Sequence, residues 1–443
     1  MRVAIELNDT SIIIHDGMKL LNNSPGYIVE AEQQVWFGND ACERAFLYSN
    51  QCRNKFWYEI ARADGNNINQ ANLKLATRHL AHMWNHVSDQ VNTVVMIVPE
   101  SFTKIGLGLL LGICKELDIP VRAMVHQAIL CPYQYDHKGD TFHVDIQLHN
   151  TVITHLKKTD RDFIAGNSKV LEGTGLVKLY EIAAEYLAKE FIKKTRLDPM
   201  HNAELEQQLY DYLPKWLRES WKSKVIECKL EYKNNSYEIQ VNTHEIHNLY
   251  NLFIETISKS ITTISSDRDN IICLSQTIDS QFGFSYVASK HQFKIRVLNT
   301  TYLAKRSLEH GNELISSDGQ VYLIKQLPYT QLTDPLDGTY SLDNNYEIPN
   351  YVLFRDHAYE IKDRIVLVKN RLDDFELFNE DSNIDDVIVS IKKSKDDVYI
   401  EFELEEGITI NKESAQSLNK LDIGDCINIP GCNDAIKLIK VDR

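Results

Sequence analysis

Two groups of histidines have spacings that could support chemistry, because imidazole nitrogens bind metals and transfer protons near neutral pH. His143, His149 and His155 recur every six residues, which would place them on one face of a continuous strand. Asn150 predicts a turn that breaks this strand, and no cysteine or acid recurs nearby at ligand spacing. We interpret these side chains as core or solvent-facing histidines.

The second group, His79, His82 and His86 in RHLAHMWNH, lies on one face of an expected helix. It lacks the acid of an HExxH zinc motif, so we interpret it as a packing face. The eight cysteines are scattered without a CxxC pair, which indicates reduced thiols, mostly buried. We predict no metal site.

Common catalytic signatures are missing from the sequence. The segment GLGLLLG, Gly106 to Gly112, falls inside an expected helix instead of in a turn after a strand, so it is no dinucleotide motif. We expect its glycines to allow close helix packing. No GxSxG, P-loop or kinase motif occurs, and no serine or cysteine has an evident base partner.

The N-terminal three quarters of the chain predict alternating strands and helices. VAIEL and SIIIH form a hairpin around Asn8 and Asp9, and a second strand pair and a helix over residues 69–87 follow. TVVMIVP, the helix after it and IPVRAMV form a strand, helix, strand unit, which favours parallel pairing. FHVDIQLHNTVITHL predicts two further strands before a long amphipathic helix capped near Thr174.

Length and composition limit the classes of function. A chain of 443 residues exceeds a single core, so we expect residues 1–325 to form a two-lobed domain, 326–349 a linker rich in turn residues, and 350–443 a small all-β sandwich. The net charge of −15 argues against nucleic acid as a partner. No apolar run is long enough for membrane insertion, and we expect a cytoplasmic protein.

The order of these elements over residues 1–320 resembles the nucleotide-binding domain shared by DnaK-type heat-shock chaperones, actin and sugar kinases. IELNDTSIIIHDG resembles the first phosphate hairpin, FHVDIQLHNTVITHL the second, and IICLSQTIDSQFGFSYV the adenosine loop. The resemblance implies a two-lobed actin-like ATPase fold, α/β with mixed sheets and flanking helices. It also implies ATP and magnesium as cofactors.

The glycines that such loops need for close backbone approach to phosphates are missing. The first turn carries Asp9, which would repel phosphate, and the second carries Gln147, Leu148 and His149. Hydroxyl and amide side chains can still donate hydrogen bonds to a nucleotide. The candidate binding residues are Thr10, Asn150, Thr151, Ser275 and Thr277.

Two interpretations of the acidic positions stay open. If the chain is active, the resemblance implies that Asp145, with Glu6, holds hydrated magnesium while Lys55 stabilises phosphoryl charge. We prefer the interpretation in which Asp145 caps a turn, Glu6 is an exposed strand residue and Lys55 is a surface lysine. ATP and magnesium are therefore disfavoured, and we assign no catalytic residue.

The C-terminal segment ITINKESAQSLNKLDIGDCINIPG resembles forkhead-associated β-sandwiches, with Asn411, Gly424 and Asp425 at matching places. The arginine and serine that grip phosphothreonine in that family are not identifiable. We therefore expect a scaffold role, with phosphopeptide binding as the other interpretation.

The leading hypothesis is a chaperone-like pseudo-ATPase that acts as an adaptor or assembly subunit, binding other proteins. The alternative is an ATP-binding, slowly hydrolysing switch protein.

Overall fold

The structure is a computed structural model that divides the chain into two compact units, Met1–Ser341 and Leu342–Arg443. Each unit is treated by itself. The residues that the structure describes are 1–65, 68–88, 91–132, 139–159, 161–265, 270–284, 293–328, 340–341, 349–355, 357–369, 374–379, 387–393, 398–402, 407–410, 413–414, 418–421, 425–432 and 434–439.

The first unit contains a six-stranded sheet in the order β16-β8-β7-β1-β2-β3. Its strands are β1 (Arg2–Glu6), β2 (Ile12–His15), β3 (Leu20–Ser24), β7 (Thr93–Val98), β8 (Val121–His126) and β16 (Leu323–Ile324). β1, β2 and β3 pair antiparallel, whereas β7 and β8 continue from β1 in parallel. The predicted hairpin and the predicted strand, helix, strand unit are confirmed.

A seven-stranded sheet in the order β17-β11-β10-β9-β14-β15-β18 repeats this plan. Its strands are β9 (Thr141–Ile146), β10 (Asn150–Lys158), β11 (Asp162–Glu172), β14 (Ile271–Ser275), β15 (Lys294–Leu298), β17 (Gln326–Pro328) and β18 (Tyr340–Ser341). β9, β10 and β11 are antiparallel, and β14 and β15 continue from β9 in parallel. The turns β1–β2 and β9–β10 thus hold equivalent positions in the two sheets.

Both faces of the first sheet are buried at its centre, which explains why β1 is apolar from residue 3 to 5 and β7 from residue 94 to 98. Val3, Ile5 and Met96 pack in a core with helices α2 to α4. Ala4 and Val95 alternate with them and face a second core, to which the other sheet contributes Leu156, Cys273 and Leu298. Side chains of both sheets therefore meet in one hydrophobic core.

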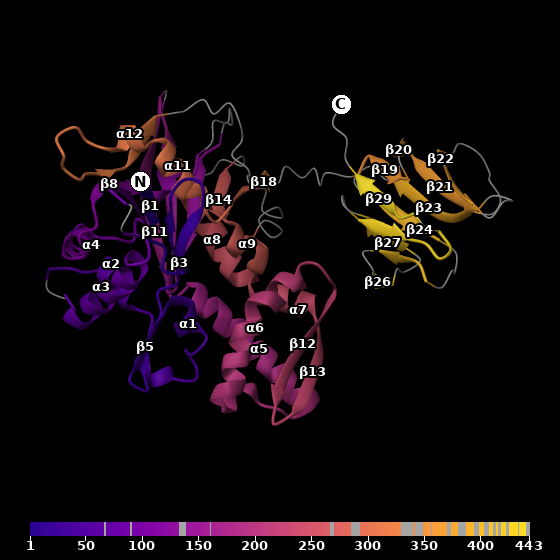
Figure 1. Cartoon of the computed structure of the whole chain (residues 1–443), viewed down its shortest axis with the longest axis horizontal. Coiled ribbons are helices and arrows are strands. Elements are labelled where there is room, and N and C mark those ends of the chain that lie inside the picture. The colour runs from indigo at the N-terminus through magenta and orange to yellow at the C-terminus, as the bar shows by residue number, and fades with distance from the viewer. Residues whose placement is uncertain are drawn as a thin grey trace. The chain divides into compact units, whose positions relative to one another are not determined.

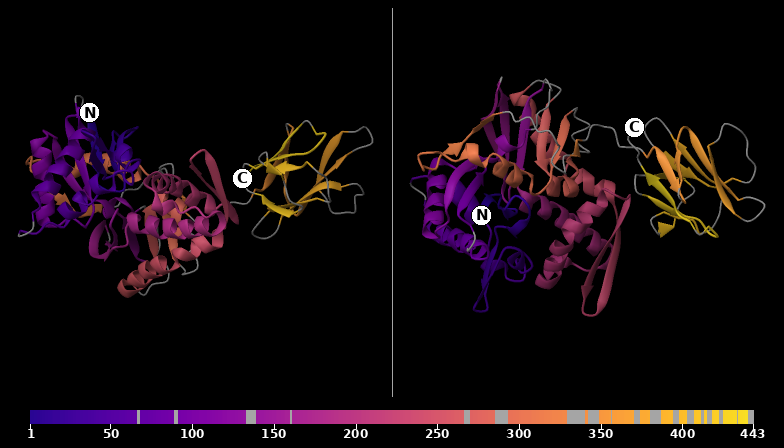
Figure 2. Two further views of the ribbon diagram at one scale, coloured as in Figure 1. Left: turned by 90° about the horizontal axis from the view of Figure 1, so that it is seen from below. Right: turned by 45° about the horizontal axis from the view of Figure 1, so that its top comes forward.

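Helices α2, α3 and α4 pack against one another, and α5 (Leu176–Thr195), α6 (Ala203–Ser220) and α7 (Thr243–Leu249) form another group with the hairpin of β12 (Val225–Tyr232) and β13 (Asn235–Asn242) (Figure 1). Further views keep this grouping (Figure 2). The helices are α1 (Gly38–Cys42), α2 (Phe56–Ala61), α3 (Gln70–Trp84), α4 (Lys104–Glu116), α5 (Leu176–Thr195), α6 (Ala203–Ser220), α7 (Thr243–Leu249), α8 (Asn251–Ile264), α9 (Gln276–Phe282), α11 (Tyr302–Glu309) and α12 (Gly311–Leu314). The smaller sheets are β4 (Ile28–Ala31), β5 (Gln34–Phe37) with β6 (Cys52–Arg53), and β12 (Val225–Tyr232) with β13 (Asn235–Asn242).

Helix α5 starts one residue later than a cap at Thr174 would place it. Its N-cap is Gly175, which makes no side-chain cap hydrogen bond, while the Thr174 hydroxyl donates to the Leu171 carbonyl. The first helical amides instead donate to the Gln147 and Leu148 carbonyls of the β9–β10 turn. The predicted threonine cap is wrong because this turn supplies the acceptors.

Of the glycines in GLGLLLG, which lies in α4 as expected, only Gly106 makes a close approach. A Cβ there would lie 2.6 Å from the Ile60 carbonyl oxygen, whereas one at Gly108 or Gly112 would meet nothing within 4 Å. The packing prediction is therefore correct for one glycine.

Within the segment predicted as a linker, β17 pairs with β11 and β18 pairs with β15. Both strands thus belong to the second sheet of the first unit. Residues 329–339 and 342–348 of that segment lie outside the described part of the chain. None of the described helices combines the length and the hydropathy that crossing a membrane requires.

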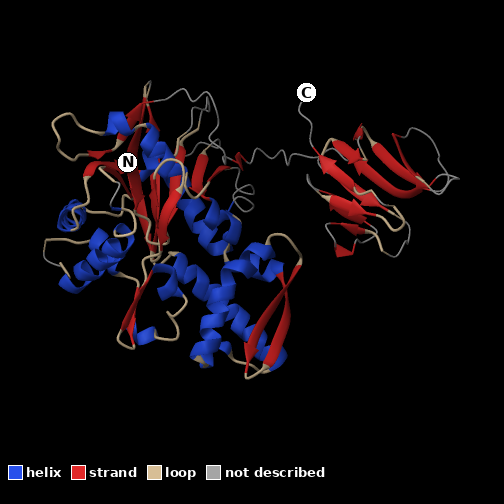
Figure 3. Cartoon of the chain, viewed as in Figure 1, coloured by secondary structure: helices blue, strands red, loops and turns tan. Residues whose placement is uncertain are grey.

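The described residues of the second unit form strands and loops without a helix (Figure 3). One sheet has the order β20-β19-β29-β28-β25-β26 and the other β22-β21-β23-β24-β27. Their side chains share one core, to which Val352 and Leu438 contribute from the first sheet and Leu367 and Ile391 from the second. The predicted β-rich region is confirmed. Its strands are β19 (Tyr351–Phe354), β20 (His357–Glu360), β21 (Arg364–Lys369), β22 (Phe375–Asn379), β23 (Val387–Lys393), β24 (Val398–Glu401), β25 (Thr409–Ile410), β26 (Glu413–Ser414), β27 (Leu418–Leu421), β28 (Cys426–Asn428) and β29 (Ile436–Ile439).

Candidate functional site

The two equivalent turns of the first unit bind each other directly. The Asn8 side-chain amide donates to Asp145 Oδ1 at 2.7 Å and to the Ile146 carbonyl at 3.2 Å. The Asp9 carboxylate accepts the backbone N–H of Leu148 at 2.7 Å. The N–H that an anion would need at the β9–β10 turn is therefore occupied by a side chain of the β1–β2 turn.

Asp145 is a buried strand residue, so the interpretation of it as a turn cap is wrong. It lies in β9, and its two oxygens accept hydrogen bonds from Asn8 and from the Gln147 side chain. Gln127 also bonds to it. Amides from three segments thus satisfy this carboxylate, which does not fit the free carboxylate expected to order hydrated magnesium.

Three acids meet here, and among the described residues His126 is the basic group that acts on one of them, Asp145. Burial, together with the nearby Asp145, raises the pKa of Glu6 to about 8. Burial and Asp145 also raise the pKa of Asp9, to about 7, against the lowering effect of the Leu148 hydrogen bond. Burial raises the pKa of Asp145 as well, and its amide partners oppose this. Each carboxylate disfavours ionisation of the next.

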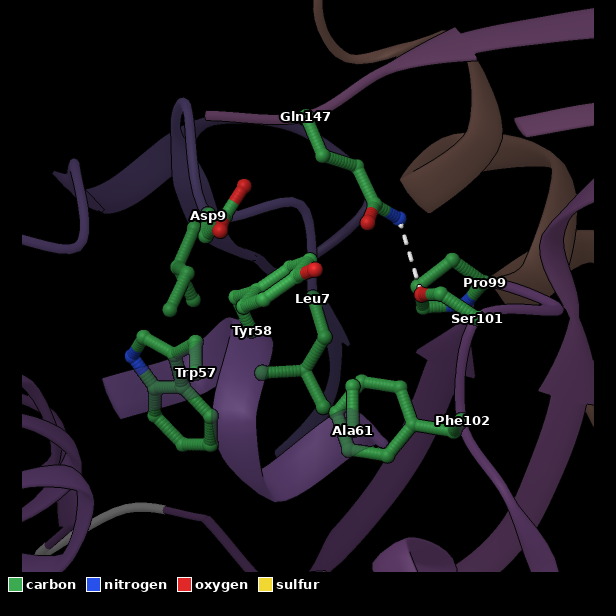
Figure 4. Close-up of a pocket in the computed structure, with 10 residues that line it drawn as sticks. Leu7, Asp9, Trp57, Tyr58, Ala61, Pro99, Ser101, Phe102 and Gln147 are labelled. Carbon is green, nitrogen blue, oxygen red and sulfur yellow. Dashed lines mark hydrogen bonds between the residues drawn. The ribbon is translucent and has the colours of Figure 1, made fainter. Parts of the chain in front are cut away.

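Side chains fill the space beside the turns, as the sequence predicted. Gln147 is buried and donates to Ser101 Oγ at 3.1 Å, and Leu148 is 2% exposed. Figure 4 shows the residues around a pocket at this point, with Gln147 joined to Ser101. The pocket has a volume of about 10 Å³, about the space of one water molecule. No ligand of useful size fits there.

A larger cavity of about 350 Å³ lies on the other side of the turns. Three predicted binding residues, Thr10, Ser275 and Thr277, line it, and so does Glu6. Glu6 is half-buried at the end of β1, and its Oε2 atom is shielded from solvent. The preferred interpretation of Glu6 as an exposed strand residue is therefore wrong.

The other predicted residues lie away from this cavity. Asn150 and Thr151 are buried at the start of β10, and the Thr151 hydroxyl donates to the Thr174 carbonyl. Lys55 lies just before α2, near His149. It is exposed, which agrees with the interpretation of Lys55 as a surface lysine. The structure thus gathers Glu6, Thr10 and the β14–α9 junction but leaves out Asn150, Thr151 and Lys55.

Sequence reasoning missed the central role of Asn8, which it treated only as a turn former. The Asn8 Oδ1 atom accepts from both the backbone N–H and the hydroxyl of Thr10, while its amide reaches Asp145. The signal available in the sequence was the polar residue Asn8 directly before the acid Asp9 in the first turn. Tyr180, Gln281 and Thr300, which also line the cavity, carried no signal because they come from distant segments.

The first group of histidines is dispersed, whereas His82 and His86 of the second group lie together, with ring centroids 5.1 Å apart. His143 lies buried in β9, His149 contacts the Asn54 carbonyl, and His155 lies 3.2 Å from Asp140. His79 is buried and contacts Ser24 and Trp57. The part of the chain that the structure describes shows no group of three or more His, Cys, Asp or Glu suited to a metal ion. No disulfide bond joins any of the eight cysteines.

In the second unit, Asn411 and Gly424 lie outside the described residues, and Asp425 immediately precedes β28. The described residues therefore do not test whether these positions bind a phosphopeptide.

Comparison with known proteins adds no family to this description. No family model matches the chain, and a search of curated proteins found no match.

Proposed function

We propose that this chain is a catalytically degenerate, chaperone-like pseudo-ATPase that serves in the cytoplasm as a protein-interaction or assembly subunit. The observation that carries the proposal is the pair of bonds Asn8–Asp145 and Asp9–Leu148. In the DnaK-type and actin-like fold that the sequence resembles, turns at these places grip phosphates. In this chain the two turns are hydrogen-bonded to each other instead.

The repeated strand order of the two sheets supports the actin-like part of this proposal, because a two-lobed fold has two halves of the same plan. The lost glycines, the buried Asp9 and the amide-bonded Asp145 support the loss of catalysis. The second unit, with its own core, serves as a scaffold for partners. Fold likeness alone names no partner.

Calorimetric titration of the full chain with ATP and ADP in magnesium buffer tests the proposal, with a thermal-shift scan beside it. We expect no saturable heat and no rise in Tm at millimolar nucleotide, because a ligand that binds only the native state must stabilise it. Saturable binding with a rise in Tm would overturn the pseudo-ATPase assignment.

The second candidate function is the ATP-binding switch. The observation that favours it is the 350 Å³ cavity lined by Thr10, Ser275 and Thr277, whose size falls at the lower end of ligand sites. If nucleotide closes the lobes, proteins captured from extract should differ between ATP-supplied and ATP-depleted samples. Under the adaptor proposal the two sets are the same.

A further inference from the structure

The 350 Å³ cavity has a wall rich in hydroxyl groups. Five of its lining side chains are serines or threonines, contributed by the β1–β2 turn, the β14–α9 junction and the segment after β15. They are Thr10, Ser11, Ser275, Thr277 and Thr300. Hydroxyls both donate and accept hydrogen bonds, so this wall suits a ligand that carries several hydroxyl groups.

The same wall carries an acid and no base. Glu6 is the one ionisable carboxylate among the lining residues, and the lining contains no Lys, Arg or His. Asp145 lies close enough to act on Glu6, since the charge of Asp145 raises the pKa of Glu6. A phosphate group would meet repulsion here, because nothing in the lining offers a positive charge.

No hydrogen bond from the described residues offsets the burial of the Glu6 Oε2 atom. Burial and the proximity of Asp145 both oppose ionisation of Glu6 and raise its pKa to about 8. A buried carboxylate is stabilised by an opposite charge within about 4–6 Å, and no basic group in the part of the chain that the structure describes acts on Glu6.

We propose that this cavity binds a small, hydroxylated organic cation, with its ammonium group at the Glu6 side and its hydroxyl groups along the serines and threonines. The apolar lining residues Val144, Ile146 and Ile278 contact the carbon skeleton. The site goes beyond the adaptor role and is opposite in charge preference to a nucleotide site.

Three probes of the same six-carbon size separate charge from shape: glucamine as the cation, sorbitol as the neutral polyol and gluconate as the anion. Titration calorimetry with the full chain at pH 8.5, where Glu6 is largely ionised and glucamine is still a cation, should give an affinity for glucamine at least tenfold above that for sorbitol, and no binding of gluconate. Equal affinities, or tighter binding of gluconate, would overturn the proposal.

Two variants locate the ligand. Glu6→Gln should remove the preference for glucamine over sorbitol, since it removes the charge and keeps the shape. Thr277→Val should weaken both ligands, and Thr277 is exposed, so folding does not depend on it. The control Glu116→Gln, the same change at the exposed end of α4, should leave both affinities unaltered. Glucamine binding that Glu6→Gln does not change would contradict the assigned pose.

Magnesium chloride and ATP complete the titration. If Mg²⁺ displaces glucamine and binds more tightly, the site is a metal site and the organic cation is rejected. ATP binding would overturn the pseudo-ATPase proposal, whereas failure of glucamine would leave that proposal intact. ATP therefore tests the pseudo-ATPase proposal, and glucamine tests the cation site separately.

Discussion

The carboxylate of Asp9 accepts the backbone N–H of Leu148 at 2.7 Å, although 139 residues separate them along the chain. Both residues are buried, Asp9 at 7% and Leu148 at 2% exposure. A hydrogen bond between buried groups of two separate sheets fixes the distance between the sheets at this point. Because this backbone N–H is already bonded to Asp9, the β9–β10 turn cannot donate it to a ligand.

Removal of this acceptor is expected to destabilise the first unit. Asp9→Ala leaves the Leu148 N–H buried without a partner, which costs about 1–3 kcal/mol. Asp9→Asn retains an acceptor oxygen and removes a buried charge, so its free energy of unfolding should stay close to that of the wild type. Urea unfolding followed by tryptophan fluorescence measures both. Equal losses for the two variants would show that charge, and not the hydrogen bond, is what matters.

Stability should depend on pH through the buried acids. Glu6 and Asp9 have pKa values of about 8 and about 7 in the folded protein, against about 4.3 and 3.9 when unfolded. Between these values the folded chain binds more protons, so stability falls as pH rises, most clearly from about pH 6.5 to 8, and levels off once both acids are ionised in the folded chain as well. Thermal unfolding at several pH values should show Tm decreasing over that range.

Two buried histidines act in the opposite direction at lower pH. Burial lowers the pKa of His79 and of His143 to about 3. Below about pH 6.5 the unfolded chain therefore binds more protons at these sites than the folded chain, and stability falls as the pH is lowered. The Glu6→Gln variant should flatten the slope from about pH 6.5 to 8 and keep the wild-type slope below about pH 4, where Glu6 is protonated in both the folded and the unfolded chain. An unaltered slope in that variant would exclude Glu6 as a source.

Gly175 should tolerate no side chain. A Cβ there would lie 2.4 Å from the backbone of Leu148 and from His149 N, so Gly175→Ala must displace either the β9–β10 turn or α5. We expect a loss of stability and of α-helical signal. Gly112→Ala is the matched control, because its Cβ meets nothing within 4 Å and alanine should stabilise α4 by about 0.5–1 kcal/mol. Circular dichroism with urea titration compares the two.

The two units should respond separately to cavities in their cores. Leu367→Ala in the second unit and Leu209→Ala in the first each remove a fully buried side chain. Each should cost its own unit about 2–5 kcal/mol. Differential scanning calorimetry of the full chain should show one transition lowered by each variant. If either variant lowers all transitions equally, the units unfold as one.

The sequence alone predicted the local elements well where short-range physics decides them. The β-branched runs of β1 and β7 and the helical spacing of α3 and α4 require no partner to be identified, since periodicity reports which faces are apolar. The cap of α5 was predicted wrongly because its amides are satisfied by the turn of Gln147 and Leu148, which lies nearly thirty residues upstream.

The candidate site followed a similar division. The resemblance identified Asp9 and the missing glycines as features hostile to phosphate, and Asp145 as the acid that would hold hydrated magnesium in an active chain. Only the tertiary structure decided that Asn8 bonds to Asp145 and that Glu6 faces a cavity together with Ser275 and Thr277. Sequence periodicity describes neighbours a few residues apart. Contacts across more than a hundred residues depend on how the two sheets close on each other, which no local pattern encodes.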